Sequence, residues 1–77
     1  FDARTAPYIR ERRWHPTQRI EEQPDDSLVL RFVVRGLNEV KRWVLFYGRG
    51  AKVLEPPELV EMMQEEIFGM QQQYWEK

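Results

Sequence analysis

One stretch of the chain, Ser27 to Gly48, constrains the fold more than any other part of the sequence. From Leu28 onward, apolar residues recur at every second position, which is the period of a β-strand. After Gly36, apolar residues recur at the three- and four-residue spacing of a helix, which Gly48 is placed to end. We therefore expect a strand that leads directly into a helix, with the rest of the chain packed against this unit.

The other elements follow in chain order. Thr5 and Pro7 favour the start of a short helix that ends near Arg12. Pro16 lacks a main-chain N–H, so it restricts the next strand to the edge of a sheet. The sequence predicts strands over residues 14–23 and 27–35, a helix over 37–47 with Asn38 as a candidate cap, a short strand over 51–55, and a final helix from Pro57 to about Tyr74.

The turn between the first two strands predicts their register. A three-residue loop, Pro24 to Asp26, pairs Gln23 with Ser27. This register places Ile20 opposite Leu30, Gln18 opposite Phe32, Arg19 opposite Arg31, Thr17 opposite Val33, and His15 opposite Arg35. We expect the even-numbered residues of strand 27–35 to face the core and the odd-numbered residues to face an open side of the sheet.

A first strand ending at Phe1 would complete a βαββαβ order, followed by a C-terminal helix. This is the ferredoxin-like (split βαβ) sandwich of the α+β class, with two helices on one face of an antiparallel sheet. In that plan the truncated first strand lies between strands 27–35 and 51–55. We expect upstream residues or a partner chain to fill the gap, and residues 1–77 to be a single domain fragment of a longer protein.

Composition argues against several classes of protein. The chain has no cysteine, which rules out a disulfide framework and favours an intracellular, cytoplasmic home. No apolar run approaches the roughly 18 residues that span a membrane. His15 and Ser27, each the sole residue of its type, make a poor set for nucleophilic catalysis or metal binding. We expect no enzyme activity, no metal and no cofactor.

Charge is unevenly distributed although the net charge is only -1. Basic blocks, residues 1–19 and 31–53, alternate with acidic ones, and the predicted fold brings several cations to one sheet face. The candidate contacts for an anionic ligand or a nucleic acid are Arg10, Arg12, Arg13, His15, Arg19, Arg31 and Arg35. Like charges across strands repel unless Glu21, an anion or an acidic partner neutralises them. An ordinary solvated surface is the alternative.

Apolar side chains also lie where one small domain need not cover them. Trp43 and Phe46 flank the apolar stripe of the predicted helix over 37–47, so either the final helix or a second subunit covers them. Trp14, Trp43 and Phe46 are therefore candidate dimer or interdomain contacts. The final helix carries its own stripe, either a core face or a partner groove, formed by Leu59, Met63, Ile67, Met70 and Tyr74.

Two stretches together resemble a known family. Residues 8–18 read YIRERRWHPTQ, and residues 35–45 read RGLNEVKRWVL before the chain continues to VLEPPEL at 53–59. Their order and spacing resemble the C-terminal extension, or WCX, domain of bacterial WYL-domain transcription regulators over nearly the whole chain. Asp26 departs from the pattern, because glycine is expected at that position of the turn.

The resemblance implies a ferredoxin-like fold and a regulatory role without enzyme activity. Such regulators carry a winged helix and a central WYL domain that senses a ligand, in some members a nucleic acid. The extension helps to dimerise the regulator and brings basic residues to the WYL domain of the same or the partner chain. By resemblance, Arg10, Arg12 and Arg13 would face the ligand or that domain.

We therefore expect a homodimer and a single-stranded nucleic acid or nucleotide ligand, with no operator reading by this part alone. The alternative is a free-standing ferredoxin-like sensor that binds a small anionic or nucleotide ligand.

Overall fold

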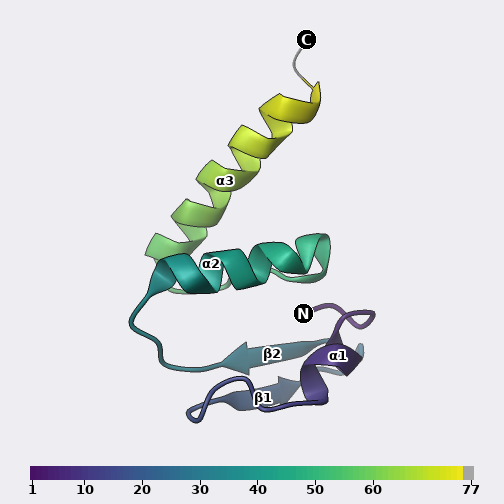
Figure 1. The fold of residues 1–77 in the computed structure, drawn as a ribbon. Helices are drawn as coiled ribbons and strands as arrows, with labels where there is room; N and C mark the ends of the chain where they lie inside the picture. The colour runs from purple at the N-terminus through teal and green to yellow at the C-terminus, as the bar shows by residue number, and fades with distance from the viewer. Residues whose placement is uncertain (76–77) are drawn as a thin grey trace.

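The computed structural model describes residues 1–75 and has a small α+β fold with a two-stranded antiparallel sheet. Its elements are α1 (Ala6–Arg10), β1 (Arg19–Glu22), β2 (Leu28–Arg31), α2 (Leu37–Phe46), the 3-10 turn η1 (Gly48–Gly50) and α3 (Pro57–Trp75). In Figure 1, α2 lies over the hairpin of β1 and β2, and α3 leads away from both.

The hairpin confirms the predicted register. Arg19 pairs with Arg31 and Ile20 with Leu30, as parity and loop length require. The loop closes with the Gln23 main-chain N–H donating to the carbonyl oxygen of Ser27 at 3.0 Å. Asp26 lies in the left-handed region with φ of 71°, a backbone conformation that favours glycine.

Strand β1 is shorter than predicted because a turn precedes it. The Gln18 N–H donates to the His15 carbonyl at 3.1 Å. The Gln18 side-chain oxygen accepts the main-chain N–H groups of Trp14 at 2.5 Å and His15 at 3.1 Å. The ladder therefore stops at Arg19. The predicted ladder pairs Gln18 with Phe32, Thr17 with Val33 and His15 with Arg35 are wrong, because all three lie beyond that end.

The predicted strand over 51–55 is a loop in the described residues, and β2 ends at Arg31 rather than Arg35. A strand needs a hydrogen-bonded neighbour, and in the ferredoxin-like plan the neighbour of both segments is the first strand. Only Phe1 and Asp2 occupy that position here. The four-stranded sheet expected from the sequence is thus reduced to a hairpin.

Helix α1 is shorter than predicted and is capped differently. Thr5 makes no side-chain capping bond. Instead the carboxylate of Asp2 accepts the Thr5 N–H at 2.8 Å, and the Asp2 carbonyl accepts the N–H of Ala6 at 2.8 Å. This cap lowers the pKa of Asp2 through the hydrogen bonds with Thr5. Asp2 therefore begins the turn that leads into α1.

Helices α2 and α3 match their predicted ranges to within one residue. Gly36 rather than Asn38 is the N-terminal cap residue of α2, without a side-chain bond. Gly48, at φ of 57°, ends the helix in the left-handed conformation that glycine adopts at low cost. Pro57 opens α3, as expected.

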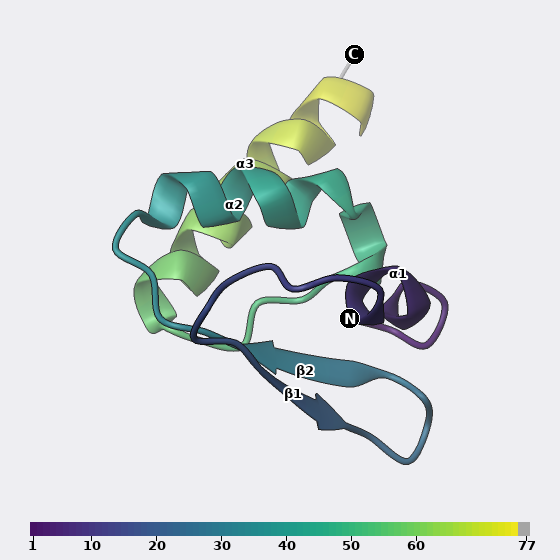
Figure 2. The same cartoon turned by 60° about the horizontal axis from the view of Figure 1, so that its bottom comes forward.

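The core lies between the hairpin and the first two helices. Ala6, Ile9 and Leu28 are its fully buried members. The partly buried residues packed against them are Phe1, Trp14, Leu30, Trp43 and Tyr47. Figure 2 shows α1 and α2 on the same side of the hairpin, which confirms that the even-numbered residues of β2 face the helices.

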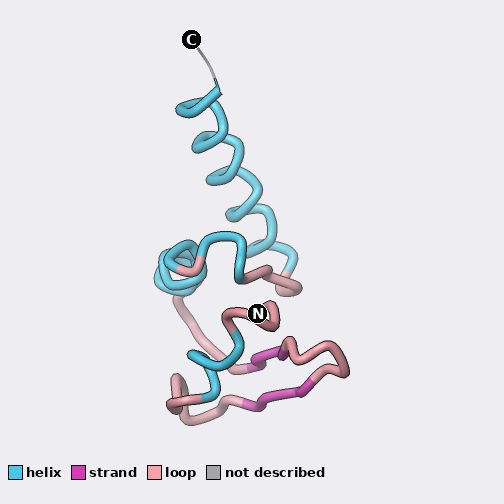
Figure 3. The backbone as a smooth tube through the Cα atoms, turned by 90° about the vertical axis from the view of Figure 1, so that its right-hand side faces the viewer, coloured by secondary structure: helices cyan, strands magenta, loops and turns pink. Residues whose placement is uncertain are grey.

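Only the first half of α3 packs against the rest of the molecule. Leu59 is buried, and Lys41 Nζ of α2 lies 3.3 Å from the Glu66 carboxylate. Ile67 is 52% exposed, and every residue from there to Trp75 is exposed. Figure 3 shows the carboxyl end of α3 extending beyond the other elements. The apolar stripe of α3 is therefore a core face only at its start.

Within residues 1–75, every helix is too short or too polar to cross a membrane.

Candidate basic ligand surface

A shallow hollow lies where α1 meets the start of β1. Its volume is about 440 Å³, and its lining residues are Arg10, Glu11, Arg12, Arg13, Gln18 and Ile20. The structure thus brings together three of the seven predicted ligand contacts: Arg10 at the end of α1, and Arg12 and Arg13 in the segment that follows it. We call this group of lining residues the basic hollow.

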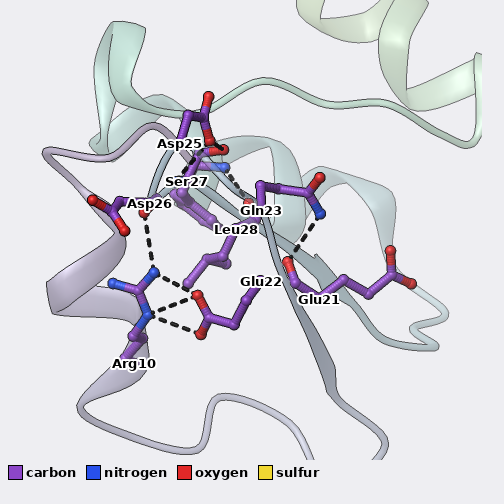
Figure 4. A network of polar contacts seen from close by, with 9 residues as sticks. Arg10, Glu21, Glu22, Gln23, Asp25, Asp26, Ser27 and Leu28 are labelled. Atoms are coloured by element: carbon purple, nitrogen blue, oxygen red, sulfur yellow. Dashed lines mark hydrogen bonds and ion pairs between the residues drawn. The ribbon is translucent and has the colours of Figure 1, made fainter.

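Arg10 is held by carboxylate and carbonyl oxygens of the hairpin. Its Nε and Nη2 atoms donate to the Glu22 carboxylate at 2.9 and 2.6 Å, and Nη2 also donates to the Asp26 carbonyl at 3.0 Å. Figure 4 shows this guanidinium between the end of α1 and the hairpin turn. The hydrogen bond with Arg10 lowers the pKa of Glu22. Arg10 therefore holds α1 against the hairpin. Since its Nε and Nη2 atoms already donate to Glu22 and Asp26, it has fewer N–H groups with which to bind an external anion.

The turn itself is rigidified by Asp25. Its carboxylate accepts the Ser27 hydroxyl at 2.5 Å and the Ser27 N–H at 3.0 Å. These hydrogen bonds lower the pKa of Asp25. The Asp26 carbonyl, which accepts a hydrogen bond from Arg10, thus lies within a turn that the hydrogen bonds between Asp25 and Ser27 stabilise (Figure 4).

Arg31 is neutralised on the face opposite the helices. Its Nε lies 2.6 Å from the Glu21 carboxylate, and its Nη1 lies 3.2 Å from that of Glu55. The hydrogen bond with Glu21 raises the pKa of Arg31. The predicted neutralisation of Arg31 by Glu21 is thus confirmed. Its cross-strand neighbour Arg19 makes no ion pair with residues 1–75, so Arg19 is better placed than Arg31 to bind an anionic ligand.

Arg12 and Arg13 are the most available cations of the basic hollow. The Arg12 guanidinium carbon lies 4.9 Å from the centroid of the Trp14 ring, which is a cation–π contact, and Arg12 is an exposed residue. Arg13 Nη2 donates to the Pro16 carbonyl at 3.3 Å. Neither side chain contacts a carboxylate among the described residues, so both guanidinium groups can pair with an external anion.

His15 and Arg35 lie apart from the basic hollow. The His15 ring nitrogen Nδ1 is 2.8 Å from the Thr17 hydroxyl, and the ring is 5.7 Å from that of Phe32. Phe32 packs toward α2, so His15 is not on the open face on which the sequence placed it. Arg35 follows β2 in the exposed connection to α2.

The candidate contact residues Trp14 and Trp43 pack against each other within the domain. Their ring centroids are 5.1 Å apart, and the indole N–H of Trp14 donates to the Ile9 carbonyl at 2.9 Å. Among residues 1–75, the rings of Phe1, Trp14 and Phe32 pack against Trp43 from outside α2, and Trp43 remains partly exposed. Its coverage by a second subunit stays a prediction. Phe46, which is 81% exposed, is the candidate that remains on the surface.

Sequence reasoning missed residues whose role depends on contacts across the fold. Gln18 holds the turn before β1, and Glu22 and Glu55 bind arginines from distant parts of the chain. The local signal for Gln18 is its position at the end of the HPTQ stretch, while the two carboxylates carry no distinguishing local pattern.

Comparison with known proteins identifies the domain. A search of curated proteins gives no match. The family model described as the WCX domain matches residues 1–71, which is most of the chain. The chain therefore belongs to the WCX domain family.

Proposed function

We propose that this chain is the C-terminal regulatory module of a bacterial WYL-family transcription regulator, located in the cytoplasm and without enzyme activity. In this role it dimerises the regulator and adds cations to the ligand site of a WYL domain from the same or the partner chain. Membership of the WCX family supports the regulatory context. We further propose that the complete fold is a ferredoxin-like sandwich, consistent with the confirmed hairpin register and helix placement.

The basic hollow is the observation that carries the ligand role. Arg12 and Arg13 flank Trp14 and Pro16 at an exposed corner, and neither contacts a carboxylate in residues 1–75. Guanidinium groups beside an aromatic ring suit a phosphate with an attached base. The ligand that fits this arrangement is a short single-stranded nucleic acid or a nucleotide.

Titration with a thymidine oligonucleotide of about eight nucleotides tests this role. Binding followed by fluorescence anisotropy should weaken as salt rises from about 50 to 200 mM. The double variant Arg12→Ala/Arg13→Ala should bind more weakly and lose about 0.7 of the logarithmic salt slope for each phosphate contact removed.

The double variant Arg42→Ala/Arg49→Ala is the matched control, because it removes two exposed arginines that lie outside the basic hollow. Equal losses in the two double variants would show that only net charge matters. Competition by a mononucleotide at similar concentrations would instead favour the small-ligand sensor, the alternative function.

Phe46 and the exposed half of α3 support the dimerisation role. Phe46 is 81% exposed, and α3 continues with apolar side chains exposed at Ile67, Phe68 and Trp75. Apolar surface of this kind on a small domain is commonly covered by another subunit. We assign the dimer contact to Phe46 and the carboxyl half of α3, and we keep the partly exposed Trp14 and Trp43 as further candidate contacts.

Light scattering across a concentration series tests the dimer. Phe46→Ser should shift the mass toward that of the monomer, whereas Tyr8→Ser, which changes an aromatic residue of α1 that is 65% exposed, should leave it unchanged. A chain that remains monomeric at millimolar concentration would contradict intrinsic dimerisation, and equal effects of both variants would contradict the assignment of Phe46.

A further inference from the structure

Tyr8 is an exposed aromatic residue on the helix that leads to the basic hollow. It lies in α1 and is 65% exposed, whereas Ala6 and Ile9, on the opposite face of that helix, are fully buried. Within residues 1–75, no other aromatic ring packs against Tyr8. Packing in the core therefore does not account for an aromatic side chain at this position.

Tyr8 lies one helical turn before the basic hollow. Glu11, which lines the hollow, is the C-terminal cap residue of α1 and keeps a helical backbone, with φ of -67° and ψ of -23°. Residues three apart on a helix are neighbours on one face, with Cβ atoms about 5–6 Å apart. Tyr8 and Glu11 are therefore neighbours on the exposed face of α1, and Arg12 and Arg13 follow directly in the chain.

Trp14, the other aromatic residue beside the hollow, has less ring surface to offer a ligand. The Arg12 guanidinium carbon lies 4.9 Å from the centroid of its ring, and the Trp43 ring centroid lies 5.1 Å away. Its indole N–H donates to the Ile9 carbonyl at 2.9 Å. Trp14 thus supports Arg12 from within the domain, and Tyr8 is the exposed ring next to the hollow.

Charge along this surface separates a place for a phosphate from a place for a base. Arg12 and Arg13 attract a phosphate, whereas the carboxylate of Glu11 repels one. An uncharged part of a ligand is therefore better suited than a phosphate to the surface from Glu11 to Tyr8. A nucleobase is uncharged and planar, and any base can stack on an exposed aromatic ring.

We propose that Tyr8 is the stacking platform for a base of the single-stranded nucleic acid or nucleotide whose phosphate binds at Arg12 and Arg13. The inference rests on the proposed ligand role and adds to it a contact with the base. Because tyrosine is uncharged, this contact releases no counterions, so its contribution to affinity should not change with salt.

Two probes of equal length separate the contacts with bases from those with phosphates: a thymidine oligonucleotide and the same sugar-phosphate chain without bases. Tyr8→Ala should weaken binding of the thymidine oligonucleotide by about 5- to 100-fold, the range for one lost stacking contact, and should leave its salt slope unchanged. It should not alter binding of the abasic chain. Tyr8→Phe keeps the ring and should bind both probes as the unaltered chain does. Tyr74→Ala is the matched control, because Tyr74 is an exposed tyrosine outside the hollow.

NMR spectra of the unaltered chain give a second readout that needs no substitution. The thymidine oligonucleotide should move the Tyr8 ring-proton signals upfield, and the abasic chain should not. Unchanged binding by Tyr8→Ala, equal losses for both probes, or unmoved ring signals would overturn the assignment of Tyr8. If Arg12→Ala/Arg13→Ala still weakens binding in that case, the proposed ligand role stands and only the stacking contact is rejected. Failure of both probes to bind the unaltered chain would reject both.

Discussion

Replacing Ile9 by alanine tests how far the stability of the domain depends on its small core. Ile9 is 0% exposed and lies with Ala6 and Leu28 at the centre of that core. Each buried methylene contributes about 0.8 kcal/mol, and the cavity left behind adds to the loss, so Ile9→Ala should cost about 2–4 kcal/mol. A core of this size supplies only about 3–5 kcal/mol in total, so this variant should be largely unfolded at room temperature.

The same substitution at Ile67 is the matched control. Ile67 is also helical but is 52% exposed, so Ile67→Ala should cost less than about 1 kcal/mol. Ile9→Val gives a graded measurement if Ile9→Ala does not fold, with an expected cost of about 0.5–1.5 kcal/mol. Urea unfolding followed by circular dichroism measures all three. A loss for Ile67→Ala as large as that for Ile9→Ala would refute our view that the second half of α3 stands outside the core.

Other predictions concern the turns and the hairpin. A Cβ at Gly50 would collide with the Thr5 hydroxyl, so Gly50→Ala should lower the free energy of unfolding by about 1–3 kcal/mol, while Gly69→Ala, in open space on α3, should change it by at most about 1 kcal/mol. Asp26→Gly should raise the urea midpoint, with a gain of about 0.5–1 kcal/mol, because it relieves the positive φ; an unchanged midpoint would contradict this. The folded pKa of Glu22 lies below its ordinary value of 4.5, so its stabilising effect is present above that pH and is lost as pH falls through the folded pKa. Glu22→Gln should therefore flatten the fall of unfolding free energy below about pH 5, and an unaltered pH profile would show that its pairing with arginine is not stabilising.

Local patterns were enough to predict the hairpin register and the ranges of α2 and α3. Side-chain alternation and a three-residue loop leave one register, which the pairing of Ile20 with Leu30 confirms. Gly48 ends α2 because glycine adopts positive φ without steric cost. This preference belongs to the residue itself, so it can be predicted without knowledge of tertiary contacts. Pro57 likewise begins α3 because its missing N–H is not needed there.

The candidate site was only partly predictable, because charge in a sequence does not show which carboxylate an arginine meets. Arg10 finds Glu22 twelve residues away, and Arg31 finds Glu55 twenty-four residues away. Their pairing separates them from Arg12, which stacks on Trp14 and meets no carboxylate in the described part of the chain. The seven candidate cations look equivalent in the sequence. In the fold, three of them line the basic hollow, and the others are paired with carboxylates or lie apart from it.

The sequence by itself determined the elements that depend on near neighbours: the parity of the strands, the turn, and the order of α1, β1, β2, α2 and α3. Tertiary structure alone decided how far those elements extend and what covers them. Residues 51–55 have the composition of a strand but remain a loop, because backbone groups form a ladder only where a neighbouring strand meets them. In the same way, Trp43 was predicted to lie on a flank and instead packs under Phe1 and Trp14, because residues far apart in the chain converge only after folding.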